Sequence, residues 1–231
     1  TGAAPVVARI AKEQGALVIA TVTYPFSLER NRKNTADWGI NELNKTADLT
    51  LVVENERLLS YASNLPMEKA FEVADNIIGE SIKAISDSIS IPSFMNIDFS
   101  DLRNIVGGSG MGVIGVGTGT GSGPERIEEA IRSTREHPLV AADYTGAKGA
   151  LIHITAGPNL TIQETNQIGE GVTEGLAPNA NVIMGARIVP EFENKIKVLS
   201  IITGVKTKVG EIVSRVNASS NWNLGIVESI Y

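Results

Sequence analysis

The feature that most constrains this fold is an alternation of apolar runs with a helix-like segment near the start of the chain. Residues 17–24 and 49–53 are short apolar runs rich in β-branched side chains, and residues 35–45 between them have a helical pattern. Such runs are typical of strands that are buried on both faces of a parallel sheet. Strand, helix and strand at this spacing predict a βαβ unit and therefore an α/β fold.

A long helix is predicted after this unit, from Pro66 to about residue 88. Its apolar residues recur at spacings of three and four, which places them on one face of a helix long enough to bridge two domains. With 231 residues, 42% of them hydrophobic, the chain can bury one large core or two modest ones, and the pattern favours two. The apolar face comprises Met67, Ala70, Phe71, Ala74, Ile77, Ile78, Ile82 and Ile85.

The alternation resumes in a second α+β region, residues 108–205. A capping box at Thr161 is expected to open its second helix. The last two strands follow each other closely, so we expect them to pair antiparallel. The elements are predicted in the order β-α-β-α-β-β, over residues 111–116, 124–136, 150–155, 161–175, 181–189 and 196–203.

The composition argues against several classes of protein. A net charge of −6 does not suit nucleic-acid binding, which normally needs a basic face, and the lack of cysteine removes disulfides, zinc–thiolate sites and thiol nucleophiles. No run approaches the ~20 apolar residues of a membrane span, and no signal-peptide pattern opens the chain. We therefore expect a soluble, cytoplasmic protein without direct membrane insertion. His137 and His153 have no metal partner nearby in sequence, so no metal site is predicted.

Polar side chains follow both strands of the βαβ unit. Segment 25–33 carries Glu29 among three cationic side chains, and Asn55 comes just after the second strand. Ligands of open α/β sheets bind beyond the carboxyl ends of the strands, so Glu29 could bind a sugar hydroxyl while the cations offset phosphate charge. Asn55 could line the same site. A solvated charged loop is the alternative.

Phe71 and Asp75 lie four residues apart on the long helix and share a face. A ring for stacking beside a carboxylate suits a purine base. The alternative is that Phe71 belongs to the core and Asp75 is a surface acid.

Glycines precede two predicted helices, where backbone N–H groups can turn toward an anion. Gly2 lies just before a helix that has Pro5 in its first turn, although an ordinary helix start explains it as well. Residues 117–123 have four glycines but lack the Lys-Ser/Thr ending of a P-loop. A flexible connection between strand and helix is the favoured interpretation of that segment.

Segment 96–101, NIDFSD, places a carboxamide and two carboxylates ahead of a short helix. Asp98 suits the N-cap position, and Asp101 suits the third helical position, where a negative charge favours the helix dipole. The same placement leaves carboxylate oxygens accessible, so Asn96, Asp98 and Asp101 could also orient a water molecule. Capping and catalysis are compatible roles.

Several motifs, in this order, resemble the FtsZ family of prokaryotic tubulin homologues. The resemblance covers residues 1 to about 204, and the tail after it looks more archaeal than bacterial. It implies a remainder of a Rossmann-like GTPase domain, a long central helix with a synergy loop, a C-terminal domain, and a linker with a tail peptide, over 1–65, 66–107, 108–205 and 206–231. The motifs are TGAAP (1–5), PFSLE (25–29), AFEVADN (70–76), NIDFSD (96–101), GAKG (146–149) and TAGPNLT (155–161).

The resemblance implies a site for GTP or GDP, with Mg²⁺ possible beside the nucleotide. Lys33 stands where the family usually has an arginine, and Arg32 lies beside it, so the bidentate contact of that arginine would change. The matching residues are Thr1 and Gly2 (end of the phosphate loop), Glu29 (ribose), Lys33, Asn55 (nucleotide lining), and Phe71 and Asp75 (guanine seat).

NIDFSD matches the family's synergy loop, which acts on a neighbouring subunit. By this resemblance Asp98 and Asp101, with Asn96, enter the nucleotide site of the next subunit in a head-to-tail filament and polarise the attacking water. Because carboxylates are weak bases, positioning and electrostatics are the expected contribution. The filament would lie at the mid-cell division ring. A membrane-tethering adaptor would bind the apolar cluster that ends the tail: Trp222, Leu224, Ile226, Val227, Ile230 and Tyr231.

Two functions remain open on this resemblance. The family's first strands and phosphate loops would lie upstream of Thr1, so this chain alone is expected to be inactive. As part of a complete FtsZ it would be a filament-forming GTPase. Alternatively, it is a non-catalytic half-molecule that offers its synergy loop to a filament end and caps or modulates the filament.

Overall fold

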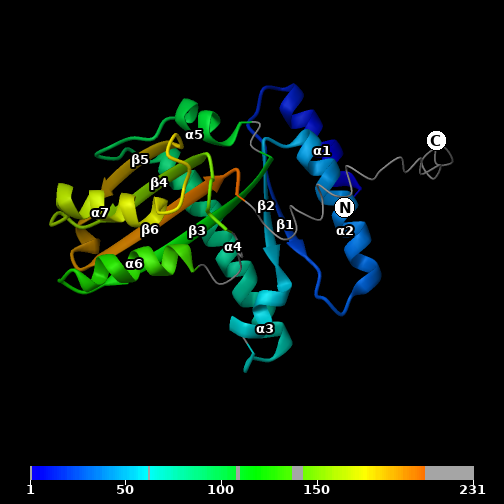
Figure 1. Cartoon of the computed structure of the whole chain (residues 1–231), viewed down its shortest axis with the longest axis horizontal. Coiled ribbons are helices and arrows are strands. Elements are labelled where there is room, and N and C mark those ends of the chain that lie inside the picture. The colour runs from blue at the N-terminus through cyan, green and yellow to red at the C-terminus, as the bar shows by residue number, and fades with distance from the viewer. Residues whose placement is uncertain (1, 62, 108–109, 137–142, 206–231) are drawn as a thin grey trace.

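Six strands form one mixed sheet in a computed structural model that describes residues 2–61, 63–107, 110–136 and 143–205 (Figure 1). The strand order is β1-β2-β3-β6-β4-β5. Thr1, His137 and the tail 206–231 lie outside the described residues. The strands are β1 (Ile19–Tyr24), β2 (Leu49–Glu54), β3 (Gly110–Thr120), β4 (Gly149–Ala156), β5 (Asn181–Ile188) and β6 (Lys195–Thr203).

Helices cover the sheet in two groups, with one long helix between them. Figure 1 shows α1 and α2 beside β1 and β2, α6 and α7 at the opposite end, and α4 between the groups. The α-helices are α1 (Ala3–Glu13), α2 (Arg30–Thr46), α3 (Leu58–Tyr61), α4 (Met67–Ser90), α5 (Phe99–Val106), α6 (Glu125–Arg135) and α7 (Ile162–Thr173), with short 3₁₀ turns η1 (Asn55–Arg57) and η2 (Pro190–Phe192).

The βαβ unit is confirmed. β1 and β2 pair parallel from Ile19–Leu49 to Tyr24–Glu54, and α2 connects them. The first three residues of β2 also pair parallel with the start of β3, so the strands of both regions join in one sheet. β2 is buried from Leu49 to Val53, which explains why four of these five residues are apolar.

The last two strands do not pair with each other, so that expectation was wrong. β6 lies between β3 and β4 and is antiparallel to both, whereas β5 is parallel to β4 at the sheet edge. The burial of the side chains explains this order of strands. β6 is buried from Val198 to Thr203, as a central strand must be, whereas β5 begins with the exposed Asn181 and Val182.

The glycine-rich segment 117–123 is only partly a connection, because β3 continues to Thr120. A Cβ atom at Gly117 would overlap Thr134, and one at Gly119 would overlap the carbonyl oxygen of Arg126. These glycines therefore let α6 approach the sheet closely. Only the residues after Thr120 connect the strand to the helix.

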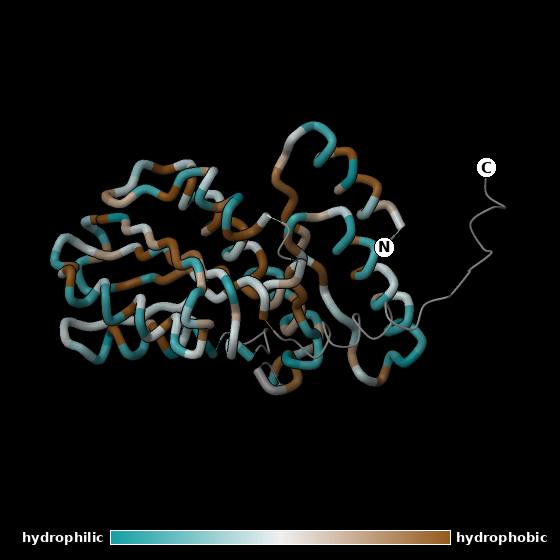
Figure 2. The backbone as a smooth tube through the Cα atoms, turned by 45° about the horizontal axis from the view of Figure 1, so that its top comes forward, coloured by the Kyte–Doolittle hydropathy of each residue, from teal (hydrophilic) through white to brown (hydrophobic). Residues whose placement is uncertain are grey.

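Hydrophobic residues recur along the strands (Figure 2), and those that are buried form clusters between the strands and the helices. One cluster joins β2, β3 and α5 through residues such as Leu49, Ile114 and Val106. Another joins β4 and β6 to α6 and α7, with Ile168 and Ile196 fully buried. None of the helices in the described part of the chain is long and apolar enough to cross a membrane.

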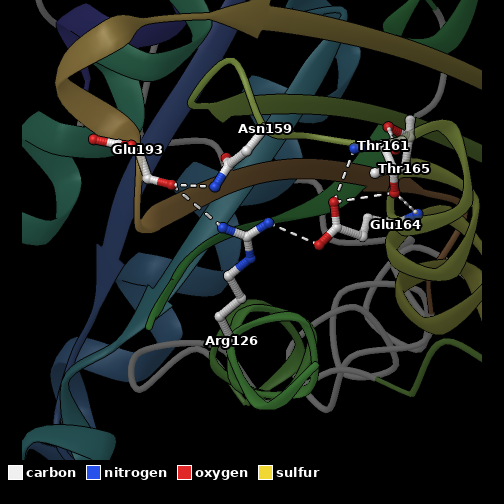
Figure 3. A network of polar contacts seen from close by, with 6 residues as sticks. All are labelled: Arg126, Asn159, Thr161, Glu164, Thr165 and Glu193. Atoms are coloured by element: carbon white, nitrogen blue, oxygen red, sulfur yellow. Dashed lines mark hydrogen bonds and ion pairs between the residues drawn. The ribbon is translucent and has the colours of Figure 1, made fainter. Parts of the chain in front are cut away.

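A polar network ties α6 to α7 and to the turn before β6 (Figure 3). The buried Arg126 donates to Glu164 Oε1 at 2.7 Å, and Asn159 donates to the carbonyl oxygen of Glu193, also at 2.7 Å. Glu164 also completes the expected capping box with Thr161. Partial burial raises the pKa of Glu164, but the hydrogen bonds from Arg126 and Thr161 outweigh it and lower that pKa.

Candidate functional site

A cleft of about 330 Å³ opens beyond the carboxyl ends of β1 and β2. The chain leaves β1 through Pro25 and enters α2 at Arg30, and it leaves β2 directly into η1. Glu29 and Asn55, which follow different strands, therefore face one cavity, as the strand-end argument predicts. The lining residues are Thr23, Pro25, Glu29, Arg32, Thr35, Ala36 and Asn55.

Glu29 is held at the N-terminus of α2 by two contacts. It forms an ion pair with Arg32 and accepts a hydrogen bond from the backbone N–H of Phe26 at 3.2 Å. The bond from Arg32, followed by that from Phe26, lowers the pKa of Glu29, so the carboxylate is ionised at neutral pH. The cleft thus presents a carboxylate and a guanidinium side by side.

Lys33 lies outside the residues that line the cleft. Its ammonium group donates to Ser27 Oγ at 3.2 Å and lies 5.9 Å from the centre of the Tyr24 ring. The Tyr24 hydroxyl in turn donates to the buried Asp37 at 2.8 Å. The cation at the cleft is therefore Arg32, which the sequence offered as one of three cations near Glu29 and as the neighbour of Lys33. The sequence feature that points to Arg32 is its position three residues after Glu29 at a helix start, because this spacing puts the two side chains on one face of the helix.

The first turns of α4 lie against the loop that carries Glu29. The Phe71 ring meets Phe26 edge to face, with centroids 6.2 Å apart, and Phe71 remains 36% exposed. Asp75, one turn further along α4, is exposed. Ser27 donates its N–H to Glu56 Oε2 at 2.6 Å, which ties this loop to η1. Phe71 thus packs on the loop and still presents ring surface.

Gly2 is the N-cap residue of α1 and has ordinary helical backbone angles (φ −64°, ψ −36°). It is exposed, and no atom lies within 4 Å of the position that a Cβ atom would take there. A helix N-terminus alone does not define an anion site, so the role expected for Gly2 remains a prediction, as does that of Thr1.

The acids before α5 form the expected capping arrangement. Asp98 Oδ1 accepts from the N–H of Asp101 at 2.7 Å, and Asp101 Oδ2 accepts from the N–H of Asp98 at 3.1 Å. The box uses one oxygen of each carboxylate and leaves the other outside it. Asn96 Oδ1 accepts from the N–H of Ser93 at 2.7 Å, and Ser93 Oγ lies 3.4 Å from the buried His153.

The acids and the cleft lie at opposite ends of the same strands. The cleft follows Tyr24 at the end of β1, whereas Arg103 of α5 donates to the carbonyl oxygen of Gly15, in the turn before β1, at 2.9 Å. A six-residue strand spans about 20 Å. Asp98 and Asp101 are thus placed away from the cleft of their own chain. Among the described residues, no cluster of three or more acidic, histidine or cysteine side chains could hold a metal ion.

Two family models match this chain. The model of the Tubulin/FtsZ family GTPase domain matches residues 1–63, and the model of the FtsZ family C-terminal domain matches residues 110–206. The two matches flank α4 and segment 96–101.

Archaeal proteins of known family are similar over most of the chain. Cell division protein FtsZ 2 of Methanocaldococcus jannaschii is 50% identical, over 90% of this chain and 55% of that protein; its counterpart in Haloferax volcanii is 46% identical, over 90% and 51%. The chain spans about half the length of these curated relatives.

Solved structures agree with these relatives. The structure described as an empty FtsZ dimer of M. jannaschii has a TM-score of 0.77 and 36% identity, over 88% of this chain and 59% of the other. GDP-bound CetZ1 of H. volcanii (TM-score 0.75, over 94% and 64%) is 18% identical and shows the fold alone. Together with the two family models, these similarities establish that the chain belongs to the FtsZ family of tubulin-like proteins.

Proposed function

We propose that this chain is part of a filament-forming GTPase of the cell-division ring, in which GTP is hydrolysed at the contact between consecutive subunits. One observation carries the proposal: the cleft and the acids lie at opposite ends of β1 and β2. Stacking subunits head to tail would bring the acids of one subunit to the cleft of the next. A head-to-tail interface that does not close into a ring makes a filament.

The residues that line the cleft, together with Phe71 and Asp75 of the neighbouring α4, suit the parts of a guanine nucleotide. Glu29 would accept from the ribose hydroxyls, and Asn55 would line the sugar and phosphates. Phe71 would stack on the base, and Asp75 would accept from its N–H groups. Arg32 would supply the cation expected of Lys33, because its guanidinium lines the cleft and can bind phosphate or ribose through two donors. Thr1 and Gly2 would end the phosphate loop.

In this proposal the synergy loop contributes position and charge. The capping box holds Asp98 and Asp101 at fixed rotamers, and each keeps one oxygen outside the box for the attacking water. Such preorganised groups act on a loose phosphoryl-transfer transition state without being strong bases. Mg²⁺ would enter with the nucleotide. The tail 206–231 would bind the membrane-tethering adaptor.

The nucleotide site needs polypeptide beyond the described residues. Within them, β1 has a strand neighbour on one side only, and α1 exposes Val6, Val7 and Ile10 by 46%, 64% and 52%. An open strand edge and an exposed apolar face of this kind fit further strands and helices packing there. This observation supports a GTPase that is complete only with additional chain.

The alternative is a non-catalytic half-molecule that caps or modulates FtsZ filaments. It is favoured by the capping box of Asp98 and Asp101, which presents both acids independently of the cleft. Such a chain would donate acids to a neighbour without binding nucleotide itself.

Complementation between two defective variants tests the proposal. The chain is combined with the N-terminal half of the M. jannaschii relative, and GTP turnover is measured for Glu29→Ala, for Asp98→Ala and for a mixture of both. Each variant alone should be nearly inactive. The mixture should recover activity at contacts where an intact cleft meets an intact synergy loop. A mixture as inactive as its components would exclude catalysis between subunits, and no turnover with the unaltered chain would favour the half-molecule.

A further inference from the structure

An apolar groove of about 340 Å³ lies between β5, the start of α7 and the segment before α5; we call it the α7 groove. Two large side chains stand at its rim, with Phe94 82% and Ile162 84% exposed. None of the described side chains that line it carries a charge. They are Phe94, Met95, Pro158, Leu160, Thr161, Ile162, Thr165, Asn166, Met184, Ala186 and Ile188.

The walls of the α7 groove are held by hydrogen bonds, so the groove is preformed. Met95 exchanges two backbone hydrogen bonds with Ala186, at 2.9 and 3.0 Å, which joins the segment before α5 to the sheet edge. The Thr161 capping box fixes the start of α7 and hence Ile162. Contiguous exposed apolar surface beside a formed cavity is typical of an interaction site.

We propose that the apolar segment 222–231 of this chain docks in the α7 groove. The segment, WNLGIVESIY, has six large apolar side chains and one charged side chain, Glu228. It therefore matches a groove without charges, which would penalise a more polar peptide for losing its hydration. Tryptophan and tyrosine are the residue types that supply most contact area in such grooves, and the segment has one of each, Trp222 and Tyr231.

The length of chain between the sheet and this segment permits the docking. The described chain ends at Val205, just after β6, and the strand register puts Ala186 level with Val198. Seven residues of strand and two strand spacings then separate Val205 from the groove, or about 25 Å in all. Residues 206–221 span about 50 Å when extended, which is enough for a path around the sheet edge.

The consequence of docking rests on the proposed function. Phe94 and Met95 directly precede Asn96 in the segment that carries the catalytic acids. A docked tail would cover the surface that the next subunit must approach. Subunits would remain unassembled until another partner removes the tail from the groove, so the tail and the filament contact would compete for one face.

Tryptophan fluorescence tests the docking without nucleotide or filament. The chain has two tryptophans, so Trp38→Phe leaves Trp222 as the single reporter. In the chain with Trp38→Phe alone, the emission of Trp222 should be blue-shifted. Adding Phe94→Asp or Ile162→Asp should move it toward the emission of free tryptophan. Leu59→Asp is the matched control, since Leu59 is 57% exposed on α3 and does not line the groove. Emission that is the same in all four chains would overturn the proposal.

Cross-linking distinguishes the tail of the same chain from that of a second copy. Because the chain has no cysteine, Ile162→Cys combined with Ile226→Cys introduces a single defined pair. Mild oxidation should give an intramolecular disulfide at a rate independent of protein concentration, and Leu59→Cys with Ile226→Cys should not. Covalent dimers formed at a rate that rises with concentration would assign the groove to a second copy. Failure of GTP turnover would leave both experiments interpretable.

Discussion

The two ends of the β1–β2 strand pair are held together in different ways. At the start of α5 each carboxylate accepts from a backbone N–H three residues away, in the Asp98–Asp101 box. At the cleft, contacts between distant segments are needed: Ser27 binds Glu56, and Phe26 packs on Phe71. The acid end is therefore encoded locally, whereas the cleft forms only when β1, α2 and the end of β2 have assembled, with α4 packed on the adjoining loop.

This difference explains why the sequence predicts the contacts of the acids at 96–101 more fully than the lining of the cleft. A capping box is a property of four consecutive residues, and its geometry follows from the helix start itself. Which cation lines a cleft depends on how a helix is rotated against the sheet. Local sequence thus predicts the capping contacts of the acids well and the lining of the cleft less well.

The largest expected effect separates the two roles of Asp98. Asp98→Ala should lower GTP turnover of the assembled protein about 10²-fold, because it removes a preorganised group from the transition state. It should also destabilise α5 by about 1 kcal/mol through loss of the cap. Asp98→Ser is the matched control, since serine caps a helix without a charge.

The Asp98→Ser variant separates helix capping from catalysis at Asp98. Thermal unfolding should be nearly normal for Asp98→Ser while its turnover stays low. Normal turnover in that variant would mean that capping alone matters and that the carboxylate has no catalytic part.

At the cleft, Arg32 and Lys33 should differ in their effect on nucleotide affinity. Arg32→Ala is expected to weaken GDP binding about tenfold, or about 1.4 kcal/mol, because it removes a charged donor from the cleft. Lys33→Ala should change it less than about threefold, since that ammonium group contacts Ser27 and Tyr24. Titration calorimetry on the assembled protein measures both, and the opposite ranking would return the role to Lys33.

Phe71→Leu tests whether the aromatic pair serves the base as well as the loop. Leucine keeps the apolar contact with Phe26 but removes the ring face, which should weaken GDP binding by about 1 kcal/mol. Phe26→Leu is the paired variant, because it removes the same edge-to-face contact and leaves the ring of Phe71 in place. Equal losses in both variants would indicate that Phe71 acts only by supporting the loop.

The smallest effect is a pH dependence of the loop beside the cleft. The hydrogen bond from Arg32 lowers the pKa of Glu29, and the backbone N–H of Ser27 lowers that of Glu56, in each case from 4.5. These contacts are intact above that value and are lost as the pH falls through the lowered pKa values. The Ser27 amide resonance should therefore move only below about pH 4.5. Glu56→Gln should abolish that titration, and a shift between pH 6 and 8 would contradict the assignment.

Much of the fold could be predicted because its signals are periodic. The βαβ unit, the long helix and both capping boxes follow from spacings of two to four residues. The pattern did not predict that β6 lies inside the sheet and β5 at its edge. Strand order is decided by which strand has apolar side chains on both faces. The strand character of Gly117 and Gly119 was missed because their purpose is the close approach of α6.

The sequence by itself determined the α/β alternation, the capped acids at 96–101 and the polar segments that follow β1 and β2. Only the tertiary structure decided that Arg32 lines the cleft, that β6 lies in the middle of the sheet, and that α5 contacts the turn before β1. The physical reason is the range of the interactions. Caps and helical faces depend on neighbours within four residues, whereas strand order and the rotation of a helix depend on packing between segments distant in sequence, some of them 98 residues apart.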